Sequence, residues 1–135
     1  MRQAGAGWPQ GHAVLTVPRA WPRSWVARAV LGLLVAGLLV GTATHLENIA
    51  RAGFVPRPEL PLGCNLFWSA LVLLDPLAIG VLLLRPRAGV LLVLAIMAAD
   101  LTVNVAYLGM TWPVVAQVGY ALVGCLAWPL VSKAR

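Results

Sequence analysis

Four long apolar runs divide this sequence, and they constrain its fold more than any other feature. Each run holds about 20 residues, the length that a helix needs to cross the hydrocarbon core of a bilayer. Of the 135 residues, 61% are hydrophobic and only 10% are charged, whereas about a quarter are charged in soluble domains. The sequence therefore predicts an all-α, integral membrane four-helix bundle. The expected spans are 26–46, 65–84, 89–109 and 113–131.

The basic residues predict how this bundle lies in the membrane. Of the ten Lys and Arg residues, only Arg51 and Arg57 lie in the first loop. The other eight lie before or at the start of the first span, in the short turn at 85–87, or after the fourth span. Basic residues accumulate on the cytoplasmic side, so we expect both termini there. The composition, biased towards Ala, Val, Leu, Arg and Gly, favours a bacterial inner (plasma) membrane. The net charge of +6 is scattered in short flanks, which predicts no nucleic-acid partner.

The chain is expected to have two parts. Residues 1–24 are rich in Gly and Pro, and Pro18 and Pro22 discourage a continuous helix, so this segment is predicted to be a flexible cytoplasmic tail. Residues 25–135 form the four-span transmembrane domain. This domain is expected to contact the lipid bilayer. It is also expected to form a homo-oligomer or to belong to a larger membrane complex.

Two aspartates, Asp75 and Asp100, lie near the middle of the second and third spans. An ionisable side chain at membrane depth is a functional-site hypothesis by default. Low dielectric and like charge both oppose ionisation of the two carboxyls together, so at least one is expected to take and give a proton. Pro76 follows Asp75 and deprives the Val72 carbonyl of its helical hydrogen bond.

Most other polar side chains of the spans are expected between the midplane and the outer surface. On the third span Asp100, Asn104 and Tyr107 share one helical face. The tight turn at 85–87 makes spans two and three antiparallel neighbours, so their polar faces are expected to meet. These residues predict an outward-facing polar cavity. Its candidate ligand- or proton-binding residues are Asp75, Asp100, Asn104, Asn65, Trp68, His45, Glu47, Tyr107 and Gln117.

Neither a metal nor a cofactor is predicted. Cys64 and Cys125 form no Cys-x-x-Cys motif, and His12 and His45 have no paired spacing. Glu47 is expected to pair with Arg51 four residues on. The sequence shows no catalytic fingerprint and no ordered motif of a known family.

Three functions fit these features. The preferred one is a small multi-pass membrane protein whose cavity binds a small ligand or cation, or relays protons, through Asp75 and Asp100. A membrane enzyme that uses the two carboxyls as acid and base on a lipid-like substrate stays open, with no catalytic residue assigned. A structural or accessory subunit is the third, because polar residues in membranes also serve as interhelical hydrogen bonds.

Overall fold

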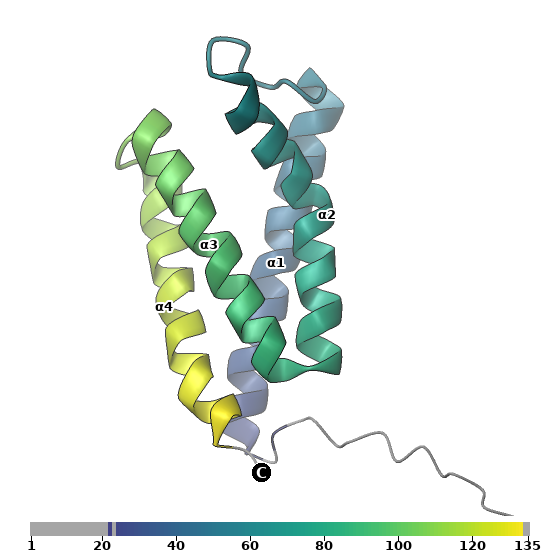
Figure 1. The fold of residues 1–135 in the computed structure, drawn as a ribbon, viewed down its shortest axis with the longest axis vertical. Coiled ribbons are helices and arrows are strands. Elements are labelled where there is room, and N and C mark those ends of the chain that lie inside the picture. The colour runs from purple at the N-terminus through teal and green to yellow at the C-terminus, as the bar shows by residue number, and fades with distance from the viewer. Residues whose placement is uncertain (1–21, 23, 134–135) are drawn as a thin grey trace, which may run out of the picture.

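The computed structural model describes residues 22 and 24–133, and over these residues the chain folds into four α-helices without strands. They are α1 (Trp25–Ala52), α2 (Leu62–Leu84), α3 (Pro86–Leu108) and α4 (Trp112–Ser132) (Figure 1). Each is long and apolar enough to cross a membrane. The prediction of an all-α, integral multi-pass membrane protein is confirmed. The predicted tail, residues 1–24, lies outside the described residues except for Pro22 and Ser24.

The helix bounds differ from the predicted spans mainly at the end of α1. This helix continues past residue 46 to Ala52, because residues can stay helical beyond the apolar run and Glu47 pairs with Arg51 across one turn, at 2.5 Å. It ends at Gly53, whose φ of 74° is favourable only for glycine. Helices α2 and α3 begin at Leu62 and Pro86 rather than at 65 and 89. Pro86 suits the first turn of a helix, where no amide hydrogen is needed.

The helices form a ring in which each packs against the next in sequence and α1 closes it against α4, the least extensive contact of the four. The two helix pairs α1–α2 and α3–α4 diverge towards one end of the bundle (Figure 1). We call this the open end, and it carries the segment 53–61 and the turn 109–111. The closed end carries the turn at Arg85, the start of α1 and the end of α4.

Close helix contacts fix the closed end. Gly89 of α3 lies so near the backbone of Leu82 that an added Cβ would collide with the Leu82 Cα. Arg87 donates from Nε to the Val131 carbonyl at 3.1 Å and from its guanidinium to the Ser132 carbonyl at 3.0 Å. A cation at these carbonyls satisfies acceptors that the end of a helix leaves unpaired. The start of α3 is thereby joined to the end of α4.

Tyr120 joins α4 to α1 midway along the bundle. Its hydroxyl donates a hydrogen bond to the Leu34 carbonyl, and its ring packs where Gly37 leaves no side chain. Large apolar side chains cover the outside of the bundle, as expected for a surface in contact with lipid. Examples are Leu39, Leu73, Leu84, Leu122 and Leu126.

Candidate functional site

Asp100 lies in α3 within a closed set of hydrogen bonds. The Nδ2 of Asn104 donates to Oδ1 of Asp100 at 3.1 Å and to Oε1 of Gln117 at 2.8 Å. The Nε2 of Gln117, on α4, donates to Oδ2 of Asp100 at 2.5 Å. Both carboxyl oxygens therefore accept hydrogen bonds from amides, the pattern that an acceptor-only carboxylate requires.

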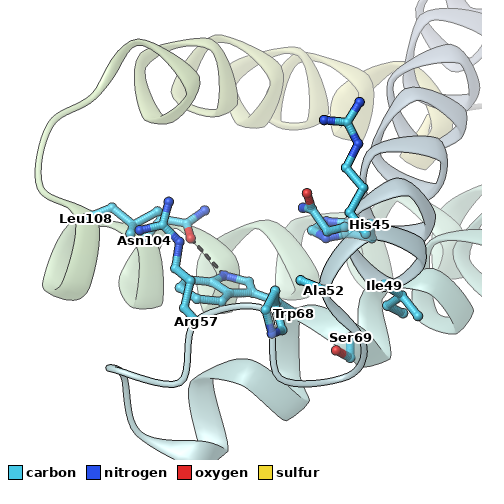
Figure 2. A pocket seen from close by; sticks show the side chains of 11 residues that line it. His45, Ile49, Ala52, Arg57, Trp68, Ser69, Asn104 and Leu108 are labelled. Carbon is cyan, nitrogen blue, oxygen red and sulfur yellow. Dashed lines mark hydrogen bonds between the residues drawn. The ribbon is translucent and has the colours of Figure 1, made fainter.

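Trp68 connects α2 to this set. Its Nε1 donates to Oδ1 of Asn104 at 2.9 Å, and both side chains are buried (Figure 2). The polar faces of the second and third spans thus meet as their antiparallel arrangement predicts. Hydrogen bonds run from Trp68 through Asn104 to Asp100, so the donors are directed towards the carboxyl.

Asp75 differs from Asp100 because one of its oxygens has no partner. Its side chain is 3% exposed, and its Oδ1 is buried without a hydrogen bond to any described residue. Leaving such an oxygen unpaired costs about 1–3 kcal/mol. Pro76, inside α2, removes a further hydrogen bond at the Val72 carbonyl. A buried oxygen without a partner, such as Oδ1 of Asp75, needs an explanation other than packing.

Groups from all the other helices lie around Asp75. On α1, a Cβ added to Gly41 would lie 2.6 Å from Oδ2 of Asp75, so the absence of a side chain there makes room for the carboxyl. Asp100 on α3 and Tyr120 on α4 are close enough to Asp75 to interact with its charge. Among the described residues, no direct hydrogen bond joins the two aspartates. Asp75 therefore lies where the four helices meet.

Two cavities, of about 360 and 390 Å³, lie at the open end. The first is bounded by α1, α2, α3 and the segment 53–61, and its lining includes His45, Trp68 and Asn104 (Figure 2). The second lies beside the turn between α3 and α4. Arg57, Asn104 and Leu108 line both cavities, which therefore adjoin. Through the Asn104 amide, both are connected to Asp100.

Asn65 holds the segment 53–61 in place. Its Oδ1 accepts from the Arg57 backbone N–H at 2.8 Å, and its Nδ2 donates to the Arg57 carbonyl at 2.8 Å. Ser69 donates to the Phe54 carbonyl at 2.9 Å. Asn65 is fully buried and lies in the lining of neither cavity. Asn65, a predicted site residue, thus holds the Arg57 backbone in position from outside the two cavities.

Replacing Asn65 with alanine is expected to release this segment. Two hydrogen bonds to the Arg57 backbone are lost, and we expect a destabilisation of about 2 kcal/mol. Hydrogen exchange at the Arg57 amide should become much faster. The control is Asn48→Ala, at an exposed position of α1, which should leave the exchange unchanged. An unchanged rate in Asn65→Ala would show that the segment is held by other contacts.

The remaining predicted residues lie around the cavities with different surroundings. His45 lines the first cavity, and Glu47 forms the predicted ion pair with Arg51 on the exposed surface of α1, where such pairs contribute little stability. Tyr107 lines the second cavity and is 45% exposed. The structure thus brings Asp75, Asp100, Asn104, Trp68 and Gln117 together, with His45 and Tyr107 at the cavities above them.

Three residues of this region were not among the predicted site residues. Arg57 was considered only as a charge in a loop. Its two flanking prolines, which restrict the backbone, and its place on the polar side of the bundle could have indicated a site residue. Tyr120 lies three residues after Gln117, on the same face of α4. Gly41 gave no sequence signal, because only the approach of Asp75 shows why a side chain is missing there.

The arrangement can perform two kinds of chemistry. A carboxyl with an unpartnered oxygen can accept a proton, and the cavities can hold a small molecule within hydrogen-bonding reach of Arg57 and His45. Within residues 22 and 24–133, no group of three or more His, Cys, Asp or Glu residues is arranged to hold a metal ion. Cys64 is buried and Cys125 exposed, and neither forms a disulfide.

Comparison with known proteins leaves the family of this chain open. No protein-family model, curated protein or solved structure matches it. Its function is therefore inferred from its side chains and cavities.

Proposed function

We propose that this small multi-pass membrane protein binds a small ligand in the cavities at its open end and exchanges a proton at Asp75. The observation that carries the proposal is the buried, unpartnered Oδ1 of Asp75 beside the fully hydrogen-bonded Asp100. In a low-dielectric setting an unpaired carboxyl is more stable with a proton than with a charge. Asp100, whose oxygens both accept hydrogen bonds, is suited to hold the negative charge.

A proton fits this pair better than a metal cation does. A metal cation needs several oxygen ligands at once, whereas a proton needs one, and Asp75 supplies one. Asn104 lines both cavities and donates to Asp100, so a ligand that changes the Asn104 hydrogen bonds also changes the field at Asp75. Ligand binding and protonation are coupled in this proposal through Asn104 and Asp100.

The distribution of basic residues supports an orientation for this function. With the closed end cytoplasmic, the cavities face the outside, in keeping with the excess of basic residues at the termini and at the turn 85–87. The composition supports placing the protein in a bacterial inner membrane.

Infrared spectroscopy of the protein in lipid bilayers tests the proton at Asp75. We expect a carbonyl band of a protonated carboxyl at neutral pH, which Asp75→Asn removes. Glu59→Gln, which changes an exposed carboxyl in the segment 53–61, is the control and should keep the band. The proposal is wrong if the wild type lacks the band, or if Asp75→Asn retains it.

A further inference from the structure

Among the residues that the structure describes, the Arg57 guanidinium at the open end has no hydrogen-bond or ion-pair partner. Arg51, the other arginine that lines the first cavity, is paired with Glu47. For Arg57, the hydrogen bonds within the described residues involve only its backbone. Asn65 bonds both its N–H and its carbonyl, and the Leu60 N–H donates to the same carbonyl at 3.0 Å. The backbone is therefore fixed while the guanidinium stays available. A guanidinium presents five donors in a planar fork that matches carboxylate and phosphate oxygens.

The cavities around Arg57 are lined by cationic and hydrogen-bond-donating groups, which an anion requires. Among the described residues, their linings include Arg57, Arg51 and His45 but neither Asp nor Glu. Asn48 in the first cavity and Thr111 in the second add neutral donor groups. Figure 2 shows Arg57 extending from the segment 53–61 towards Asn104 and Leu108, with His45 across the cavity on α1. An oxyanion between these elements would meet donors from more than one side.

We propose that the cavities around Arg57 bind an oxyanion, a carboxylate or phosphate group, with the Arg57 guanidinium as its principal ligand. This inference rests on the proposed function, because it names the class of ligand that the cavities take. An anion on Arg57 and a proton on Asp75 together add no net charge to the membrane interior, which lowers the cost of binding both. A cation in these cavities would instead lie beside the positive charge of Arg57.

The oxyanion has two possible sources, a soluble acid or the headgroup of an anionic lipid. The first arm of the test uses lipid-free protein in detergent, to which inorganic phosphate or acetate is added against chloride of equal ionic strength. The second arm compares nanodiscs that contain phosphatidylglycerol with nanodiscs of phosphatidylcholine alone. Thermal unfolding is measured in both. A shift with phosphate or acetate identifies a soluble acid, and a shift confined to phosphatidylglycerol identifies a headgroup.

Arg57→Gln is expected to weaken binding at least about tenfold in whichever arm responds, because it removes charge-assisted hydrogen bonds. Arg57→Lys keeps the charge but loses the fork, so its affinity should fall between those of wild type and Arg57→Gln. The matched control is Arg85→Gln, which removes an exposed arginine at the closed end and should bind as the wild type does. The inference is overturned if neither arm shifts the unfolding temperature, or if Arg57→Gln responds like the wild type.

Calorimetry separates this inference from the proposed function. Anion binding is measured at a pH above that at which the Asp75 carboxyl band disappears, in two buffers of different ionisation enthalpy, so that proton uptake appears as a difference between the two binding enthalpies. Anion binding without proton uptake would leave the oxyanion site standing and refute the proton exchange. A carboxyl band at Asp75 without any anion effect would refute the oxyanion site alone.

Discussion

Replacing Asp75 with leucine is expected to stabilise the bundle, whereas the same replacement at Asp100 is expected to destabilise it. Leucine branches at the same atom as aspartate, and at Asp75 it removes a buried oxygen without a partner. We expect a gain of about 1–3 kcal/mol. At Asp100 it leaves donors of Asn104 and Gln117 without their acceptors, at a cost of about 1–3 kcal/mol for each. Unfolding of the detergent-solubilised protein by heat or by sodium dodecyl sulfate measures both.

The opposite signs are the informative part of this experiment. Both aspartates are almost fully buried, at 3% and 2% exposure, so a general effect of placing leucine in the bundle would have the same sign at each. A loss at both positions would mean that Asp75 also makes a structural bond. The accessory-subunit hypothesis would then take precedence over the proton-exchange hypothesis.

Replacing Gly89 with valine is expected to cause the largest loss of stability at the closed end. A Cβ at this position would collide with the Leu82 Cα and lie 2.6 Å from the Leu82 backbone nitrogen. Backbone atoms of a packed helix cannot move aside as a flexible side chain can, so the two helices must separate. We expect a loss of about 3 kcal/mol, at the upper end of the range for overpacked cores. Thermal unfolding in detergent measures it.

Gly32→Ala is the matched control, because no atom lies within 4 Å of a Cβ built there. Its effect should be small or favourable, by up to about 1 kcal/mol, since alanine is a better helix former than glycine. Gly89→Ala should give a smaller loss than Gly89→Val. If all three variants unfold like the wild type, the contact between α2 and α3 at Leu82 is less close than described.

The fold was predictable because lipid imposes one strong rule, that each spanning segment must satisfy its own backbone hydrogen bonds. Apolar runs of sufficient length therefore predict helices, and the tight turn at 85–87 predicts antiparallel neighbours. The end of α1 was missed since residues 47–52 include Glu47, Asn48 and Arg51, and hydropathy does not show that a helix continues beyond the apolar run. The cap at Gly53, with its positive φ, marks the true end.

The site was predictable where helical periodicity determines the geometry. Spacing alone predicts that Asp100 and Asn104 share a face, and they are bonded across one turn. Spacing does not reveal which atoms of different helices meet. Asn65 was therefore assigned to the cavity although it holds the Arg57 backbone, and Arg57 itself was overlooked. The missing partner of Asp75 could not be predicted either, because an unsatisfied oxygen becomes evident only when all its neighbours are placed.

The hydrogen bonds of Asp100 have a consequence for biosynthesis. Gln117 supplies one of the two amide donors to this carboxyl, and it lies on α4, which leaves the ribosome after α3. Asp100 therefore enters the membrane before its partners are complete, and a nascent chain that ends before Trp112 carries a half-satisfied carboxylate in lipid. The hydrogen bonds of this carboxylate are thus complete only after α4 has been inserted beside α3. We therefore expect a chain that stops before Gln117 to keep a carboxylate oxygen without its partner in the membrane, a polar group by which quality control could recognise it.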